Sequence, residues 1–147
     1  MYKHILIPTD GSPRSRKSIA AGVKLAKSIG ARVTGLFAAP PATPIMLRNR
    51  LPAGYDTPRH NEALIARAAA AHLAVIEKAA RAAGVKCACI NVTSDYPADT
   101  ILQTVRKQRC GLIFMASHGR RGLRSLLLGS ETQKVLAAST IPVLVYR

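Results

Sequence analysis

The residues with the clearest chemical potential lie in one glycine-containing segment near the end of the chain. Gly119 and Gly122 can adopt positive φ and let a loop wrap closely around a phosphate. Gly129 and Ser130 then open a helical pattern, and the free N–H groups at a helix N-terminus suit an anion. The same residues also fit a capping box, with Ser130 as N-cap and Gln133 reaching back, which needs no ligand. Spacing alone leaves phosphate binding and simple capping open.

A second candidate site is the loop that follows the first apolar run. Asp10 comes directly after this run and just before Ser12 and Pro13, which are typical of a helix start. Asp10 could bind a ligand or only cap the turn, although Ser12 already offers a capping hydroxyl. Ligands of open parallel sheets bind beyond the carboxyl ends of the strands, where the strand order reverses. We therefore expect this loop to meet the later loop at 117–119.

Alternating β-rich and helical patterns position these two loops. Strands are predicted over 3–9, 32–38, 85–92, 112–116 and 142–146, and helices over 13–29, 61–83, 97–108 and 130–138. This alternation, with nearly continuous apolar strands, predicts an α/β fold: a doubly wound, Rossmann-like five-stranded parallel sheet with helices on both faces. The expected strand order is 3-2-1-4-5, in one domain over residues 1–147. A proline-rich excursion over 40–58 could be a lid or a variable surface loop, and the sequence does not decide.

Composition indicates a globular protein that attracts anions. Hydrophobic residues make up 48% of the chain, and no apolar run approaches the roughly 20 residues that a membrane span needs. The first apolar run is too short for a secretory signal, so we expect a cytoplasmic protein. The net charge of +15 favours nucleotides, nucleic acid or anionic lipid without choosing among them. Aromatic residues are only 4%, which disfavours nucleic acid.

The three cysteines do not predict a disulfide framework. Cys87 and Cys89 lie two apart on a predicted strand, so their side chains face the same way and a direct bridge would be strained. We therefore expect buried, reduced thiols in preference to a redox pair. The histidines show no HExxH or paired-cysteine spacing, so no metal site is predicted.

Three stretches of the chain resemble the universal stress protein family. They are Ile-Leu-Ile-Pro-Thr-Asp-Gly-Ser near the start, Ser-His-Gly-Arg-Arg-Gly-Leu with Leu-Leu-Leu-Gly-Ser late, and Ile-Pro-Val-Leu-Val at the end. Nucleotide-binding members of that family carry a glycine, two residues, a second glycine, nine residues, then Gly-Ser or Gly-Thr. Gly119 and Gly129-Ser130 match this pattern, whereas Ala116 takes the place of the first glycine. The resemblance covers essentially the whole chain and implies an adenine nucleotide α-hydrolase-like fold.

The resemblance also implies an ATP site, with or without Mg²⁺. It places Pro8, Thr9 and Asp10 against the base and ribose. The backbone of Ala38 would touch the adenine, and Met115 would pack beneath it. The remaining implied residues surround the phosphates: Ala116, Ser117, His118, Gly119, Arg120, Gly129, Ser130, Glu131 and Thr132.

Two of these residues depart from the nucleotide-binding pattern. Ala116 still lets a nucleotide pass if its backbone is that of an ordinary strand end, but it costs about 1 kcal/mol or more if the site needs positive φ. Glu131 stands where relatives often have an apolar residue, and its carboxylate would repel phosphates unless Mg²⁺ or Arg120 intervenes. Replacing Glu131 with valine is therefore expected to improve ATP binding or make it less dependent on Mg²⁺.

The sequence thus predicts an ATP-binding regulatory protein of the stress response, with at most slow ATP hydrolysis. It has no GxxxxGK[ST] and no GxGxxG motif, and His118 has no carboxylate partner visible in sequence. We expect His118 to be structural or a phosphate donor, and we assign no catalytic residue. A nucleotide-free dimeric interaction protein of the same fold is the alternative, and a nucleic-acid binder is less favoured.

The last strand predicts how the protein assembles. In the expected strand order, this apolar strand lies at the sheet edge, where an uncovered ladder risks aggregation. Members of the resembled family dimerise through this strand, and a two-fold pairing would cover the edge. We therefore expect a homodimer through Val143–Tyr146.

Overall fold

The computed structural model describes residues 1–41, 50, 52–53, 59–118 and 128–147. Most of the proline-rich excursion and residues 119–127 of the late loop therefore lie outside the described residues. The strands are β1 (His4–Thr9), β2 (Arg32–Ala39), β3 (Cys87–Thr93), β4 (Leu112–Ala116) and β5 (Val143–Tyr146). The helices are α1 (Pro13–Ile29), α3 (Arg59–Ala83), α4 (Pro97–Gln108) and α5 (Ser130–Ala138). In the described part of the chain, each of these elements lies within two residues of the bounds predicted from sequence.

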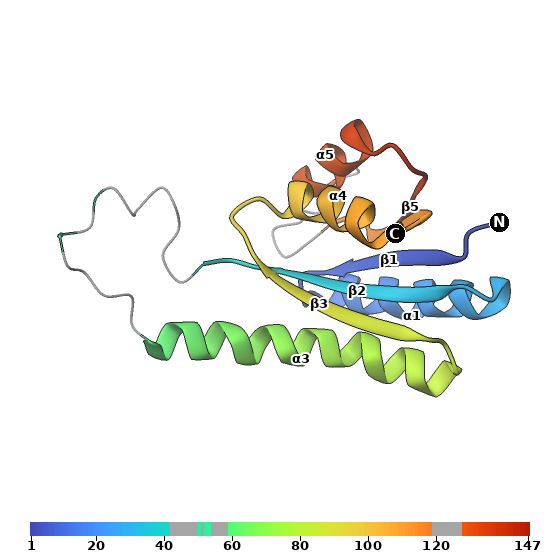
Figure 1. Ribbon diagram of the computed structural model, residues 1–147, viewed down its shortest axis with the longest axis horizontal. Coiled ribbons are helices and arrows are strands. Elements are labelled where there is room, and N and C mark those ends of the chain that lie inside the picture. The colour runs from blue at the N-terminus through green and yellow to red at the C-terminus, as the bar shows by residue number, and fades with distance from the viewer. Residues whose placement is uncertain (42–49, 51, 54–58, 119–127) are drawn as a thin grey trace.

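The five strands form one parallel sheet in the order β3-β2-β1-β4-β5, as predicted (Figure 1). Strand β1 is central and pairs with both β2 and β4. After β1 the chain adds β2 and β3 on one side of it. Strands β4 and β5 are then added on the other side, so the strand order reverses at β1. The carboxyl ends of β1 and β4 are consequently neighbours at one edge of the sheet.

Helices cover both faces of the sheet. Helices α1 and α3 lie on one face, and α4 and α5 lie on the other (Figure 1). Successive residues of β1 serve the two layers in turn: Ile5 and Ile7 pack toward α1 and α3, and Leu6 packs toward α4 and α5. Because both faces are buried, the strand reads as a continuous apolar run. Within the described residues no helix is long and apolar enough to cross a bilayer.

The ends of α1 follow the signals in the sequence. The hydroxyl of Ser12, the N-cap, accepts a hydrogen bond from the Ser15 N–H at 3.2 Å, and Pro13 is the first helical residue. The helix ends at Gly30, whose φ of 65° is the left-handed conformation that glycine adopts readily. Ile29 is 43% exposed because it lies in the last turn, beside the end of the helix.

The cysteines are free, but only one of them is buried. Cys110 is buried, which raises its pKa to about 11. Cys87 and Cys89 are half-buried, so the prediction of buried thiols was wrong for them; they lie on β3, the strand at the sheet edge. The neighbouring Cys89 thiol lowers the pKa of Cys87, and the Cys87 thiol together with burial raises the pKa of Cys89.

Gly22 lets α1 approach the sheet closely. A Cβ atom at this position would lie 2.8 Å from Cδ1 of Ile7 and 3.0 Å from Cδ1 of Phe114. Both distances are shorter than ordinary van der Waals contact, so the helix and the sheet would have to separate to admit a larger side chain.

We expect Gly22→Leu to lower the free energy of unfolding by about 1–3 kcal/mol, because the added atoms overpack the layer between α1 and the sheet. Ala20→Leu on the exposed side of the same helix is the matched control and should change stability by less than about 0.5 kcal/mol. Urea unfolding measures both. Equal stabilities for the two variants would contradict the close approach at Gly22.

Candidate functional site

The turn that follows β1 is held by its own hydroxyl and carboxylate groups. The Thr9 hydroxyl lies 2.7 Å from that of Ser15 and accepts a hydrogen bond from the Gly11 N–H at 3.1 Å. Oδ1 of Asp10 accepts a hydrogen bond from the Ser12 N–H at 3.0 Å. Asp10 therefore shapes the turn into α1, as one of the two readings from sequence required. Its role toward a ligand stays a prediction.

Helix α3 supports this turn from behind. Gly11 has φ of +78°, and a Cβ atom there would overlap the imidazole ring of His72. The same ring lies 5.1 Å from the ring of Phe37, near the end of β2. A side chain larger than hydrogen at position 11 is thus excluded by both backbone and space. Sequence reasoning missed His72, because no motif connects a residue in the middle of α3 to the Asp10 turn.

Two hydrogen bonds fix the start of α5 at the carboxyl end of β4. The Gly129 N–H donates to the carbonyl oxygen of Ser117 at 2.8 Å. The Thr132 hydroxyl donates to the carbonyl oxygen of Ala116 at 3.1 Å. The Ser117 N–H in turn donates to Tyr146 at the end of β5 at 2.8 Å. The two ends of the late loop are thereby joined, whatever path the intervening residues take.

The first turn of α5 differs from the capping box that was one of the two interpretations of the sequence. The N-cap is Gly129 and not Ser130, and within the described residues no side chain caps it. The Gln133 side chain donates to the carbonyl oxygen of Leu128 at 2.7 Å and does not reach back to the cap. The first helical hydrogen bond runs from the Gln133 N–H to the Gly129 carbonyl, so the N–H groups of 130–132 have no partner inside the helix.

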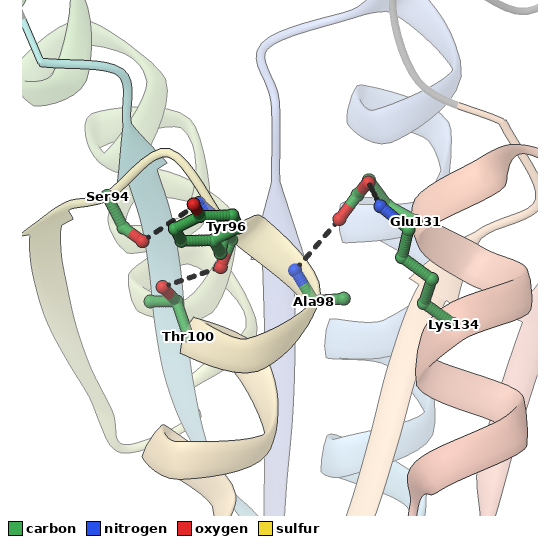
Figure 2. A network of polar contacts seen from close by, with 6 residues as sticks. All are labelled: Ser94, Tyr96, Ala98, Thr100, Glu131 and Lys134. Carbon is green, nitrogen blue, oxygen red and sulfur yellow. Dashed lines mark hydrogen bonds and ion pairs between the residues drawn. The ribbon is translucent and has the colours of Figure 1, made fainter. Parts of the chain in front are cut away.

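Glu131 turns toward the neighbouring helix. Its Oε2 accepts a hydrogen bond from the Ala98 N–H at 2.9 Å, and its Oε1 pairs with Lys134 Nζ at 2.8 Å (Figure 2). This ion pair raises the pKa of Lys134. The N-cap of α4 is Tyr96, whose side chain makes no capping bond within the described residues. Glu131 therefore caps α4 from outside, a partner that the sequence did not indicate.

The residues at the end of β4 have ordinary backbone but an unusual histidine. Arg109 is the one non-glycine residue with positive φ in the described part of the chain, so Ala116 has the geometry of a strand end. Nδ1 of His118 lies 3.1 Å from the Ser117 hydroxyl. Its Nε2 is buried without a hydrogen-bond partner among the described residues. A buried polar atom of this kind needs a partner to offset the cost of its desolvation.

The predicted site residues thus fall into two groups at neighbouring strand ends. Pro8–Asp10 end β1, and Met115–His118 with Gly129–Thr132 bring together β4 and α5. Met115 is buried in the layer that α4 and α5 cover, and half-buried Ala38 lies near the end of β2. Gly119 and Arg120 lie outside the described residues. Nowhere in the described part of the chain do three metal-ligating side chains lie close enough to hold an ion.

Known proteins with similar sequences belong to the same family that the sequence motifs resemble. The universal stress protein family model matches residues 1–147. A universal stress protein of Methanocaldococcus jannaschii is 31% identical over 147 residues, covering 100% of this chain and 83% of that protein. One of Thermus aquaticus is 32% identical over 147 residues, covering 100% of both chains.

Solved structures share the fold. A universal stress protein in complex with cAMP aligns with a TM-score of 0.71 at 20% identity, covering 99% of this chain and 97% of that one. A universal stress protein from Archaeoglobus fulgidus in complex with dAMP aligns with a TM-score of 0.65 at 17% identity, covering 99% and 98%. The family model over the whole chain and the relatives that are 31% and 32% identical show that the chain belongs to the universal stress protein family.

Proposed function

We propose that this chain is an ATP-binding regulatory protein of the stress response that hydrolyses ATP slowly at most. The observation that carries the proposal is the N-terminus of α5, held at the carboxyl end of β4 with three N–H groups that the helix does not use. This positive end of the helix dipole faces the edge of the sheet where ligands of doubly wound folds bind.

The phosphate end of the proposed site consists of backbone donors and two side chains. The N–H groups of 130–132 would bind phosphate oxygens, joined by the exposed Ser130 hydroxyl. The buried Nε2 of His118 would gain its missing partner from the same phosphates. The net charge of +15 raises the local concentration of any nucleotide.

The adenosine end lies at the ends of β1 and β2. Pro8, Thr9 and Asp10 would contact the base and ribose, the Ala38 backbone would touch the adenine, and Met115 would pack beneath it. The ligands cAMP and dAMP, each bound to one of the two structural neighbours, both contain adenine, which supports an adenine nucleotide here. The choice of ATP, with or without Mg²⁺, rests on the glycine motif of the late loop.

The proposal of slow hydrolysis rests on the surroundings of His118. Its Nδ1 contacts the hydroxyl of Ser117, which does not hold an imidazolium as a carboxylate would. A site that binds ATP without an efficient base suits regulation, in which the bound nucleotide changes the shape of the protein or its choice of partner. We place this role in the cytoplasm.

We also propose that two copies pair through β5. This strand is an edge of the sheet, and Leu144 on it is 38% exposed. The carbonyl oxygens of Pro142 and Tyr146 accept hydrogen bonds from Ile113 and Ser117 at the β4 side. Because the pattern alternates along a strand, the backbone groups of Val143 and Val145 face outward and are available to a second copy.

We expect Gly129→Asp to weaken ATP binding at least about 100-fold, because a carboxylate would enter the phosphate position. The φ of −61° and ψ of 151° at Gly129 suit aspartate as an N-cap, so the melting temperature should stay equal or rise. Calorimetry with ATP and Mg²⁺ measures the first effect, and thermal unfolding measures the second.

Ala137→Asp, exposed on the same helix, is the matched control and should bind ATP as the unaltered protein does. If the unaltered protein bound no ATP, ADP or AMP at millimolar concentration, the nucleotide-free interaction protein would replace this proposal.

We expect Glu131→Ala to lower the free energy of unfolding by about 1 kcal/mol, because α4 loses its cap. ATP affinity should change by less than about threefold, since the carboxylate is already bonded to Ala98. Lys134→Ala keeps the capping bond and should cost less stability. A large loss of Mg²⁺-dependent ATP binding with unchanged stability would show instead that the carboxylate holds the metal.

We expect Val145→Pro to convert a dimer into a monomer, because proline removes a donor that faces outward from β5. Leu144→Pro should instead disrupt the ladder with β4 and give unstable or insoluble protein. Sedimentation at high micromolar concentration distinguishes these outcomes. An unaltered chain that sediments as a monomer would refute the pairing.

A further inference from the structure

The helices α1, α3 and α4 each lead directly into the next strand at one end of the sheet, opposite to the proposed nucleotide site. Figure 1 shows the α1–β2 and α3–β3 turns on the right. Hydrogen bonds place the three turns beside one another: the Arg32 N–H donates to the carbonyl oxygen of Lys3 at 3.0 Å, and the carbonyl oxygen of Lys86 accepts one from β2 at 2.8 Å. The Gly111 N–H donates to the carbonyl oxygen of His4 at 2.9 Å, so the α4–β4 turn adjoins the start of β1.

These three turns have the same backbone geometry. Each helix ends at a residue in the left-handed conformation, with φ of 65° at Gly30, 71° at Gly84 and 52° at Arg109. The N–H of each of these residues donates to the carbonyl oxygen three residues earlier, which each time belongs to a basic residue: Lys27, Arg81 or Arg106. The repeated geometry therefore brings a cation from each helix to the same end of the sheet.

Each turn also contains a second basic residue, so that positive charge gathers at this end. We call it the basic end, and it consists of six exposed residues: Lys27, Arg32, Arg81, Lys86, Arg106 and Arg109. Among the acidic residues in the described part of the chain, only Glu77 lies toward this end, because the others follow a strand or lie in the first turns of helices. Cations in the last turn of a helix offset its dipole, but Arg32 and Lys86 belong to no helix.

Arg109 is the residue that most clearly indicates a function for this charge. It adopts the conformation that glycine adopts in the other two turns, and a residue with a Cβ atom loses free energy there. A Cβ atom added at Gly30 or Gly84 would have no atom within 4 Å, so this position of the turn faces open space. Arg109 is exposed in the same way, and its effect is to place a charge at the surface. Backbone strain of this kind is typical of functional positions.

The shape and composition of the basic end fit an anionic lipid bilayer. Its cations span the starts of four neighbouring strands, about 14 Å across, and only the carboxyl ends of helices reach it. Duplex nucleic acid is instead read by a helix or ribbon that lies in a groove. Ile29, 43% exposed in the last turn of α1, lies among these cations and suits the interface of a bilayer. The exposed aromatic ring of Tyr96 lies at the other end of α4, which disfavours base stacking here.

We propose that the basic end binds the anionic surface of a lipid bilayer. The contact is peripheral: the cations pair with lipid phosphates, and no part of the chain crosses the membrane. The proposed nucleotide site lies at the opposite end of the sheet and would face away from the bilayer. Membrane binding is therefore independent of the proposed nucleotide function.

Flotation of the whole protein with lipid vesicles tests the proposal. The protein should float with vesicles that contain phosphatidylglycerol and not with vesicles of phosphatidylcholine alone. Salt should release it, because the Debye length falls from about 10 Å at 0.1 M to about 3 Å at 1 M. Joint replacement of Arg32, Lys86 and Arg109 by glutamine should weaken binding about 100-fold, since each cation near an anionic surface contributes about fivefold in affinity.

Joint replacement of Arg14, Arg16 and Lys17 by glutamine is the matched control, because it removes the same charge from exposed positions at the other end of α1. These positions lie about 20 Å from the basic end, so binding should change by less than about threefold. Equal losses in the two triple variants would overturn the proposal in favour of attraction by net charge alone. No flotation of the unaltered protein, or binding of duplex DNA without binding of vesicles, would also overturn it.

Arg109→Gly separates this role from a structural one. The melting temperature should rise, because glycine adopts the left-handed backbone without strain, while vesicle binding should weaken about fivefold. A lower melting temperature with unchanged vesicle binding would show that Arg109 serves the fold and would contradict the proposal.

A tryptophan reporter tests the orientation on the bilayer, since the chain contains no tryptophan. The fluorescence of Ile29→Trp should shift to the blue with phosphatidylglycerol vesicles and be quenched by brominated lipid. Leu64→Trp is the matched control, because Leu64 is 49% exposed near the start of α3, at the other end of the sheet. Quenching at position 64 and not at position 29 would refute binding through the basic end.

Discussion

The position of β1, paired with β2 on one side and β4 on the other, is the constraint on which the rest of the structure depends. Because the chain builds outward from β1 in two directions, the loops after β1 and β4 leave the sheet edge as neighbours. A strand in this position is covered on both faces, and Ile5, Leu6 and Ile7 are fully buried. The central strand therefore requires both helical layers and at the same time creates the edge at which a ligand can bind.

The N-termini of α4 and α5 both need partners for their first backbone N–H groups, and the two helices differ in which partners they have. Each helix begins with N–H groups that it cannot bond internally. Glu131, in the first turn of α5, caps α4 through Ala98 (Figure 2). The acidic residue of α5 thus stabilises its neighbour, and the start of α5 has no side-chain cap among the described residues. The carboxylate that the sequence led us to expect beside phosphate is hydrogen-bonded to another helix.

The two edges of the sheet have different chemistry. Strand β5 presents outward-facing backbone groups and the exposed Leu144, features suited to a second strand. Strand β3 presents two half-buried thiols beneath α3. Strand β3 is separated from β1 by β2, whereas β5 pairs with β4 and its Tyr146 accepts a hydrogen bond from Ser117.

The sequence by itself determined the elements, their order and the family. Helix α1 begins after Ser12, at Pro13, and ends at Gly30. These limits come from local hydrogen bonds and backbone preferences, which act over a few residues and are visible in the sequence. The continuous apolar strands likewise required two covered faces. The glycine motif indicated which loops form the candidate site, because the residue types that admit a phosphate are few.

Only the tertiary structure decided how the site residues are engaged. The sequence left open whether Ser130 caps α5, but the N-cap is Gly129, whose N–H donates a hydrogen bond to the Ser117 carbonyl oxygen. Glu131 finds Ala98, and His72 fills the space beside Gly11, through contacts between elements far apart in the chain. Cys87 and Cys89 are half-buried because β3 is an edge strand, although their alternation was predicted correctly. Local patterns fix which residues face together, but the partner of each polar group depends on where distant segments of the chain pack.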